Sequence, residues 1–371
     1  MHESIPLVDL KWQHSQIATD VRNGWDTVLA SCQFLQGEQV GAFEQEYACF
    51  EGLEHCASVA NGTDAIELAA RAAGLQQGDA AIVPANTFVA TALALIRMGV
   101  EPVLADCDPD TFLLDPQAVA HAMGPRVRAV VAVHLFGQMA PMRAIADAAG
   151  PHVCLIEDAA QSQGARQDGR TMGNVSLAVA TSFYPGKNLG AYGDAGAVLT
   201  QHANVDRKVR ALRNYGSEVK YFHPEPGFNS RLDELQAVVL RAKLRHLAGW
   251  NEARAVAAQR YVELLAAHAD VVRLPTILPG NTPVWHLFVV RVARRDEVAR
   301  QMQSGGFGVG VHYPTPLHLQ GALGPWQRPE GSFPHAERAA REMLSLPMYP
   351  GIEPAQQERV VACLVDAVRG A

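Results

Sequence analysis

Short apolar runs alternate with amphipathic stretches along the first two-thirds of the chain. The amphipathic stretches place alanine and leucine at helical spacing, and they begin with acidic residues and end at glycine, as in residues 62–75. The apolar runs are only six to ten residues long, which is typical of strands buried in a parallel sheet. Runs of this kind occupy 56–61, 80–85, 101–107, 128–137, 154–160 and 177–184. Repeated strand–helix–strand units predict an α/β fold with helices on both faces of the sheet.

The pattern changes near residue 245, and we expect two domains, 1–245 and 246–371. A long amphipathic helix is predicted over 246–268, followed by two strands at 284–292 and 308–313. A helix over 335–344, a proline-rich turn over 345–352 and a last helix over 354–368 complete the pattern. The second part therefore predicts a smaller α+β domain packed on the first.

Composition and charge narrow the function classes. A chain of 371 residues is longer than a domain with one hydrophobic core usually is, which favours two domains. Its net charge of −7 argues against a general nucleic-acid surface. We expect no membrane span and no signal peptide, because no long uncharged apolar run occurs and the start lacks a basic segment. The six cysteines are scattered without a CxxC pair, which favours reduced thiols in the cytoplasm and no metal site.

Polar residues at three predicted strand ends suggest chemistry, because ligands of open α/β sheets bind there. Gly62 and Thr63 open a helix, where they could cradle a phosphate or simply cap the helix. Asp158 ends a buried run, as a functional carboxylate or another cap. Lys187 lies in a glycine-rich turn after a strand, as a desolvated nucleophile or an exposed loop residue. Together, the three features are the protein parts that pyridoxal phosphate requires.

The chain resembles the DegT/StrS type of sugar aminotransferases, within the fold-type-I pyridoxal-phosphate enzymes. This resemblance implies an aspartate aminotransferase-like fold, with a mostly parallel seven-stranded sheet in the large domain. It rests on motifs that occur in the family's order over nearly the whole chain: VANGTDAIELA, VPANTFVATALAL, VHLFGQ, IEDAAQSQGA, SFYPGKNLGAYGDAGA, GFNSRLDELQA, HYPTPLHLQ and SLPMYP.

The resemblance implies a role for each matched residue. Lys187 is the Schiff-base lysine and proton shuttle, and Asp158 pairs with the pyridine nitrogen. A related dehydratase branch carries histidine at the position of Lys187, so the lysine favours transamination. The other implied cofactor contacts are Gly62, Thr63 and Ser182 at the phosphate, Gln161 at the ring oxygen, Phe88 on the ring and Asn229 from the neighbouring subunit.

Asn229 and Phe88 each have a second interpretation. Ser230 and Asp233 make the segment around Asn229 read as a helix cap, and the cap and ligand roles are compatible. An aromatic residue at position 88 could equally belong to the core.

The implied reaction moves an amino group from L-glutamate, which leaves as 2-oxoglutarate, to a keto group of a nucleotide-linked sugar. Pyridoxamine 5′-phosphate is the intermediate form of the cofactor, the kinetics are ping-pong, and the enzyme is a homodimer with shared active sites. The FYPGKNLG motif resembles members that aminate C3 of dTDP-3-keto-6-deoxyhexoses. The residues implied to contact the substrate are Tyr184, Lys220 and Arg231 at the diphosphate and His312, Tyr313 and His318 near the sugar.

Two alternatives stay open at this point. One is an enzyme of the same fold that acts at C4, on a UDP-linked sugar or on a cyclitol ketone, or that makes an aminobenzoate unit. The other is a non-catalytic regulatory protein that binds pyridoxal phosphate. Against the second alternative, each aligned catalytic position is filled and no DNA-binding segment is evident.

Overall fold

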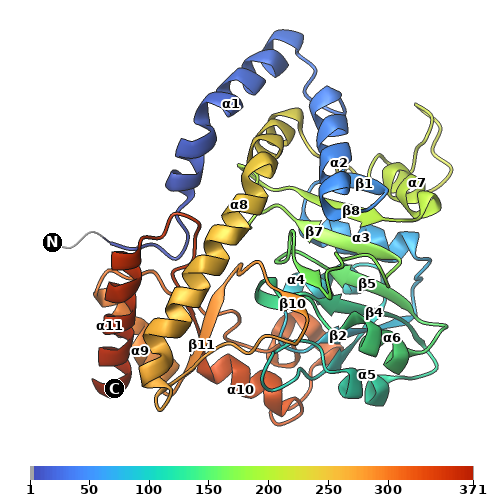
Figure 1. Ribbon diagram of the computed structural model, residues 1–371. Helices are drawn as coiled ribbons and strands as arrows, with labels where there is room; N and C mark the ends of the chain where they lie inside the picture. The colour runs from blue at the N-terminus through green and yellow to red at the C-terminus, as the bar shows by residue number, and fades with distance from the viewer. Residues whose placement is uncertain (1–3, 371) are drawn as a thin grey trace.

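A seven-stranded sheet lies at the centre of the computed structural model, which describes residues 4–370 (Figure 1). Within it, β8 runs antiparallel to both of its neighbours, and the other adjacent pairs are parallel. The strands in spatial order are β1 (His55–Val59), β8 (Gly196–Thr200), β7 (Ala178–Ser182), β5 (Cys154–Asp158), β4 (Val127–Val133), β2 (Ala80–Pro84) and β3 (Glu101–Ala105). The predicted α/β fold with a mostly parallel seven-stranded sheet is confirmed.

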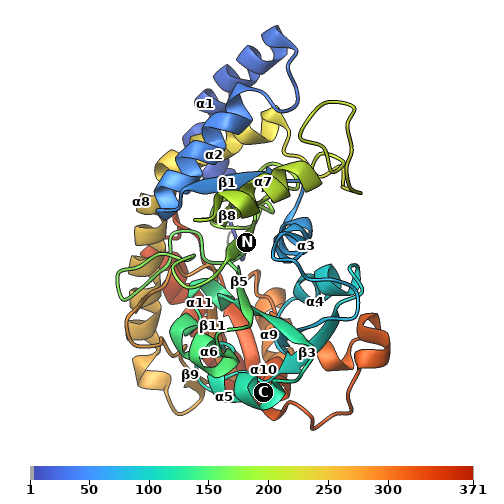
Figure 2. The same ribbon diagram turned by 90° about the vertical axis from the view of Figure 1, so that its right-hand side faces the viewer.

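The strands are mostly buried because helices cover both faces of the sheet (Figure 2). In β2, Ala81 and Val83 pack on the α3 and α4 side, whereas Ala80 and Ile82 face α5 and α6, as the alternation of strand side chains requires. The helices are α3 (Gly62–Ala72), α4 (Val89–Ile96) and α7 (Ala203–Leu212) on one face, and α2 (Glu38–Glu51), α5 (Pro116–Ala122) and α6 (Met142–Ala149) on the other.

A single long helix, α8 (Glu234–Leu265), links the large sheet to the rest of the molecule (Figure 1). It joins the helix start expected near Asp233 to the helix predicted over 246–268. The Glu234 carboxylate accepts backbone N–H groups at the start of α2, and α1 (Leu10–Ser31) packs along the first half of α8. Although α8 has 32 residues, no helix within residues 4–370 is both long and apolar enough to cross a membrane.

A second, three-stranded sheet forms the core of the C-terminal part. Its strands lie in the order β12 (Met343–Leu346), β11 (Phe288–Val292) and β9 (Val272–Arg273). The helices of this part are α9 (Arg295–Ser304), α10 (Pro334–Glu342) and α11 (Pro354–Gly370). The short strands β6 (Arg166–Gln167) and β10 (Asn281–Thr282) pair across the two parts, and single 3-10 turns lie at η1 (Leu135–Gly137), η2 (Ala266–His268), η3 (Leu317–Leu319) and η4 (Gly321–Trp326). We retain the division near residue 245 as a proposal; it falls inside α8.

Two expectations for the C-terminal part are wrong. Residues 308–313 form no regular strand, and only Gly310 makes a bridge there, to Ser345. Gly308 lies against the N-terminal segment instead, where a Cβ atom would come within 2.4 Å of the Leu7 nitrogen. The end of the predicted helix and the start of the predicted turn are strand β12, because pairing with β11 overrides the local helical pattern.

Two buried glutamates of α2 differ in their partners, which gives a stability prediction. Burial raises the pKa of Glu51 to about 8, although its carboxylate accepts the Gly164 N–H at 3.0 Å. Between its unfolded pKa and pH 8 the folded chain holds the extra proton, so stability falls as pH rises across this window. We expect Glu51→Gln to be more stable than wild type by about 2–4 kcal/mol at pH 8 and indistinguishable near pH 4.5. Chemical denaturation at both pH values measures the difference.

Glu44 is the matched control. Burial opposes its ionisation, but Arg213 and Arg210 outweigh burial and hold its pKa below the usual value. Its stabilising contribution is present at neutral pH and is lost as pH falls through that lowered pKa. Glu44→Gln should therefore destabilise the protein at pH 8, opposite in sign to Glu51→Gln. Equal effects of the two substitutions would contradict the assignment.

Candidate active site

One cavity of about 340 Å³ lies where the carboxyl ends of β4, β5 and β7 meet the first turns of α3 and α4. This is the position that open α/β sheets use for ligands. Its lining contains nine of the residues singled out from the sequence: Gly62, Thr63, Phe88, Asp158, Gln161, Ser182, Tyr184, Lys187 and Tyr313. Residues more than 250 positions apart in the chain are thus brought to one site.

Lys187 extends from the tight turn that follows β7. The turn is closed by a hydrogen bond from the Lys187 N–H to the Tyr184 carbonyl at 2.8 Å. Gly190 is required for this closure, because a Cβ atom there would lie 2.4 Å from the Pro185 oxygen. Burial lowers the pKa of the lysine to about 8, against the opposing effect of Asp158. Within residues 4–370 the amine makes no hydrogen bond or salt bridge, and with a pKa of about 8 roughly a tenth of it is neutral and nucleophilic at pH 7.

Asp158 ends β5 and is 5 % exposed. Burial raises the pKa of its carboxyl, and the Ala160 N–H, the Thr91 hydroxyl and Lys187 each oppose that rise. The Thr91 hydroxyl donates to Oδ2 at 2.9 Å, and the Ala160 N–H donates to Oδ1 at 3.2 Å. The carboxylate is therefore held in place from behind while it lines the cavity.

Gln161, Tyr313 and Phe88 form a further part of the lining. The Phe136 N–H donates to Gln161 Oε1 at 2.7 Å, so the amide nitrogen is the group that faces Tyr313, and it donates to that hydroxyl at 3.1 Å. The Phe88 ring lies 5.3 Å from the Tyr313 ring and is 53 % exposed. The exposure of Phe88 distinguishes it from a core aromatic residue.

The first turn of α3 forms a cradle of backbone N–H groups. Asn61 caps the helix by accepting the Asp64 N–H at 2.8 Å, which leaves the N–H groups of Gly62 and Thr63 outside the cap. A Cβ atom on Gly62 would lie 2.6 Å from Cβ of Ser182, and one on Gly196 would lie 2.5 Å from the Asn61 carbonyl carbon. Two glycines thus let β7 and β8 approach the helix start, where backbone donors and the helix dipole favour an anion.

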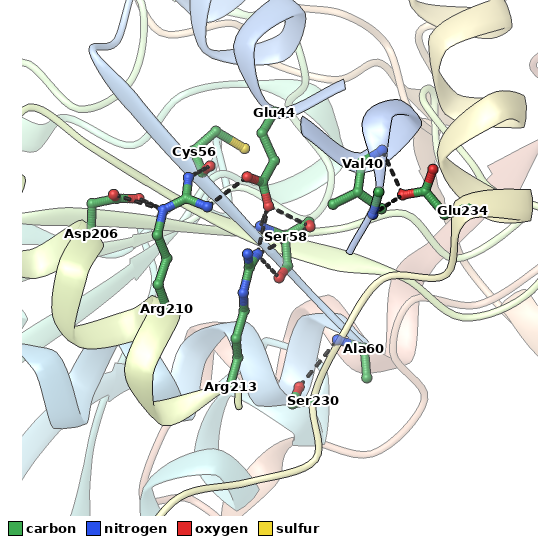
Figure 3. Close-up of polar contacts among 11 residues, drawn as sticks. Val40, Glu44, Cys56, Ser58, Ala60, Asp206, Arg210, Arg213, Ser230 and Glu234 are labelled. Carbon is green, nitrogen blue, oxygen red and sulfur yellow. Dashed lines mark hydrogen bonds and ion pairs between the residues drawn. The ribbon is translucent and has the colours of Figure 1, made fainter. Parts of the chain in front are cut away.

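A buried polar network fixes this cradle from the opposite side (Figure 3). The Glu44 carboxylate accepts the N–H and hydroxyl of Ser58 in β1 at 2.9 and 2.7 Å, and it pairs with Arg210 and Arg213 of the α7 region. These contacts hold β1 in register with α2 and α7. The strand therefore delivers the cradle at a fixed position.

Ser230 extends the network to the start of α3. Its hydroxyl accepts the Ala60 N–H at 3.1 Å (Figure 3) and donates to Asp64 at 2.8 Å. The expected role of Ser230 as a cap of α8 is therefore wrong. Asp233 does occupy the N-cap position of α8, although its side chain makes no capping hydrogen bond.

Four predicted substrate residues lie outside the cavity lining, and two of them are His312 and His318. His318 is fully buried, with Nε2 3.0 Å from Glu337 and its ring 4.8 Å from the Phe333 ring, so it offers no surface to a ligand. The expectation that His318 contacts the sugar is corrected for that reason. His312 bonds Ser345 at 2.8 Å, and burial together with the Lys187 charge lowers its pKa to about 4, so it is neutral.

The remaining predicted residues lie on the segment between α7 and α8. Lys220 lies over the Tyr221 ring at 5.0 Å, and Arg231 donates to Asn229 at 3.1 Å. None of Lys220, Asn229 and Arg231 lines the cavity of the same chain. The loop 215–228 projects from the body beside α7 (Figure 2).

Several residues of the site were not predicted. Thr87, Thr91 and Asp194 line the cavity, and His286 lies near Lys187, with its pKa lowered far below normal by burial and then by the charges of Lys187 and Arg254. The motifs NTFVAT and GDAG contain three of them, but a threonine in an apolar helix looks the same as a core residue.

The donor set suits a flat ring that bears a phosphate and an aldehyde. The cradle with the adjoining Ser182 hydroxyl meets a phosphate, Asp158 meets a basic ring nitrogen, the exposed Phe88 face meets a ring, and the unpaired Lys187 amine meets a carbonyl carbon. The chemistry of the cavity lining therefore fits pyridoxal phosphate.

Comparison with known proteins gives matches over nearly the whole chain. The model of the DegT/DnrJ/EryC1/StrS aminotransferase family matches residues 15–365. The dTDP-3-amino-3,4,6-trideoxy-alpha-D-glucose transaminase of Streptomyces venezuelae is 43 % identical over 98 % of this chain and 95 % of its own. The erythromycin biosynthesis sensory transduction protein EryC1 of Saccharopolyspora erythraea is 44 % identical over 97 % of this chain and 98 % of its own. The crystal structure of S. venezuelae DesV in complex with a ketimine intermediate superposes with a TM-score of 0.96, at 42 % identity and 98 % coverage of both chains.

Proposed function

Because the chain belongs to the DegT/DnrJ/EryC1/StrS aminotransferase family, we propose that it transfers an amino group from L-glutamate to C3 of a dTDP-linked 3-keto-6-deoxyhexose, as a pyridoxal-phosphate enzyme of amino-sugar biosynthesis. The observation that carries the chemistry is the unpaired Lys187 amine, with its lowered pKa, in the same cavity as Asp158. The choice of sugar follows the relative from S. venezuelae, which is named for a 3-amino sugar.

Different residues around the cavity would contact different parts of the cofactor. The N–H groups of Gly62 and Thr63 and the hydroxyl of Ser182 would bind the phosphate, Phe88 would pack on the ring, and Gln161 would donate to the ring oxygen. Asp158 would accept a hydrogen bond from the protonated ring nitrogen. When bound, the cofactor supplies an aldehyde that takes up amines and a ring that accepts electrons. Lys187 would hold the cofactor through its amine and would carry the proton that the reaction moves to and from the amine-bearing carbon of the substrate.

A substrate panel tests this assignment. The enzyme is incubated with glutamate and with dTDP- and UDP-linked 3-keto and 4-keto sugars, and products are identified by mass and NMR. We expect 2-oxoglutarate and a C3 amine on the dTDP sugar. A C4 amine, or preference for a UDP sugar or a cyclitol ketone, would replace the substrate assignment while preserving the reaction class.

The regulatory alternative is kept because EryC1, the relative from S. erythraea, is named as a sensory transduction protein. Addition of glutamate distinguishes the two. A catalyst loses its yellow colour as the cofactor takes the amino group, and a passive binder stays yellow.

The cradle provides a direct prediction for cofactor affinity. Gly62→Ala would place a Cβ atom 2.6 Å from Ser182 Cβ and push the two phosphate-binding groups apart. We expect affinity for pyridoxal phosphate to fall about tenfold or more, measured by spectral titration. Gly41→Ala in α2 is the control, because no atom lies within 4 Å of the added Cβ, and it should bind normally. Equal affinity of Gly62→Ala and wild type would remove the cradle from the phosphate site.

A homodimer with shared sites is part of the proposal. On the segment between α7 and α8, Val219, Tyr221 and Phe222 are 65 %, 85 % and 65 % exposed, which supports burial against a second copy. Asn229 of the same segment then reaches the cofactor phosphate of the neighbouring subunit, and Lys220, Arg231 and Tyr184 bind the diphosphate at the interface.

Mixed dimers test this sharing. Lys187→Ala and Asn229→Ala dimers should each be nearly inactive. Mixing and reassociation should restore about a quarter of wild-type activity, because half of the dimers are hybrids and each hybrid has one intact site. If Asn229 serves its own subunit, the hybrids contain no intact site and the mixture stays inactive.

We also place the enzyme in the cytoplasm. The six cysteines of the chain all lie within the described residues as free thiols, which suits a reducing compartment.

A further inference from the structure

Two threonines stand behind the carboxylate of Asp158. Thr91 lies in the first turn of α4, and Thr87 lies just before the helix. The Thr91 Oγ1 atom is 2.9 Å from Asp158 Oδ2, and the Thr87 Oγ1 atom is 3.1 Å from Thr91 Oγ1. Thr91 is 1 % exposed and Thr87 is 2 % exposed, so the chain of hydroxyls is shielded from bulk water.

Proton counting fixes the direction of this chain. A threonine hydroxyl carries one proton, and an ionised carboxylate can only accept. Thr91 therefore donates to Asp158 and accepts from Thr87, which is the outer donor. The Ala160 N–H occupies the other carboxylate oxygen at 3.2 Å, so both oxygens have one fixed donor.

Packing alone does not account for the hydroxyl of Thr91. A valine has nearly the same shape and would fill the same space in an apolar helix, whose other buried residues are Ala92, Ala94 and Leu95. A polar group at such a depth is retained at a cost unless it is hydrogen-bonded. Here its proton goes to the carboxylate of Asp158, which lines the same cavity as Lys187.

We propose that Thr91 is a positioning residue that orients Asp158 and keeps it ionised for the ring nitrogen of the cofactor, with Thr87 as the outer donor. This inference rests on the proposed function. In support, burial raises the pKa of Asp158, and the Thr91 hydroxyl is one of the contacts that counter that rise. A carboxylate that stayed protonated could not serve as the acceptor for a protonated ring nitrogen.

A pair of cofactors isolates this role. The affinities of wild type, Thr91→Val and Thr91→Ser are measured by spectral titration with pyridoxal phosphate and with its 1-deaza analogue, in which C–H replaces the ring nitrogen. We expect Thr91→Val to bind pyridoxal phosphate about tenfold more weakly. The 1-deaza analogue should bind Thr91→Val within about twofold of wild type, because it has no nitrogen for Asp158 to hold. Thr91→Ser keeps the hydroxyl and should restore most of the affinity.

The outcomes separate the inference from its premise. Equal weakening for both cofactors, or no weakening for either, would overturn the role of Thr91 and leave the proposed function standing. If wild type fails to bind pyridoxal phosphate, both the role of Thr91 and the proposed function are wrong. If Thr91→Val does not fold, Thr87→Val is tested in its place. It should lower the affinity for pyridoxal phosphate about threefold and leave the affinity for the 1-deaza analogue unchanged. Equal losses of affinity for the two cofactors would overturn the inference.

Discussion

Replacing Lys187 with alanine should lower transamination by about 10⁴-fold or more, the scale on which removal of a covalent group acts in other enzymes. The variant loses both the amine that holds the cofactor and the base that moves the proton. Activity with glutamate is measured directly. Covalent attachment is measured by reducing the loaded protein with borohydride and determining the protein mass. Wild type should gain the mass of one reduced cofactor, and Lys187→Ala should gain none.

Lys243 is the matched control for this experiment. Lys243 lies in α8, outside the cavity lining, and is 2 % exposed. Burial lowers its pKa to about 8, as for Lys187, and its side-chain nitrogen lies 5.2 Å from the centre of the Tyr192 ring. Lys243→Met should retain covalent attachment and turnover. Loss of covalent attachment in Lys243→Met, or its retention in Lys187→Ala, would contradict the assignment.

The pH dependence of attachment supplies a second check. Only the neutral amine attacks a carbonyl, so for wild type the attachment rate should rise about tenfold per unit up to pH 8 and level off above it. A lysine with an ordinary pKa of 10.5 would still be rising at pH 9.

Asp158→Asn should lower kcat by about 10²–10³-fold while the protein stays folded. An amide keeps the shape, but only its oxygen accepts, so it retains one of the two hydrogen bonds from Thr91 and Ala160 and carries no charge to hold a proton on the ring nitrogen. Steady-state kinetics with glutamate and keto sugar measure the loss. It should fall in kcat more than in KM, because the charge matters most when electrons flow into the ring.

The neighbouring Glu157 gives the contrast. Its side chain lies on the other side of β5, where it pairs with His134 at 2.6 Å and accepts from Ser176 and Gly173. Glu157→Gln should therefore lower thermal stability and leave kcat nearly unchanged. If Asp158→Asn turned over like wild type, Asp158 would be removed from the reaction.

The parts of the site that could be predicted are those at strand ends. The carboxyl ends of parallel strands meet at one edge of a sheet, so a carboxylate after one strand and a lysine after another converge wherever the sheet forms. Asp158 and Lys187 follow this rule, and the structure places both in one cavity.

The parts that could not be predicted depend on tertiary contacts. His318 looked like a ligand because a motif match does not reveal that Glu337 and Phe333, on another segment, enclose it. Thr91 looked like a core residue because only the fold shows Asp158 within reach of its hydroxyl. Residues 308–313 had an alternating pattern, but the N-terminal segment takes the place of a pairing strand there.

The continuous path of α8 through both cores has a consequence for dissecting the protein. Leu240 and Leu244 pack beneath the large sheet, and Tyr261 and Leu265 pack beneath the small one, along a rod of about 48 Å. Cutting the gene at residue 245 would divide α8 between the fragments and leave an uncovered apolar surface on each of them. Neither half is then an autonomous module, and recombining segments between relatives succeeds only at junctions that keep this helix whole.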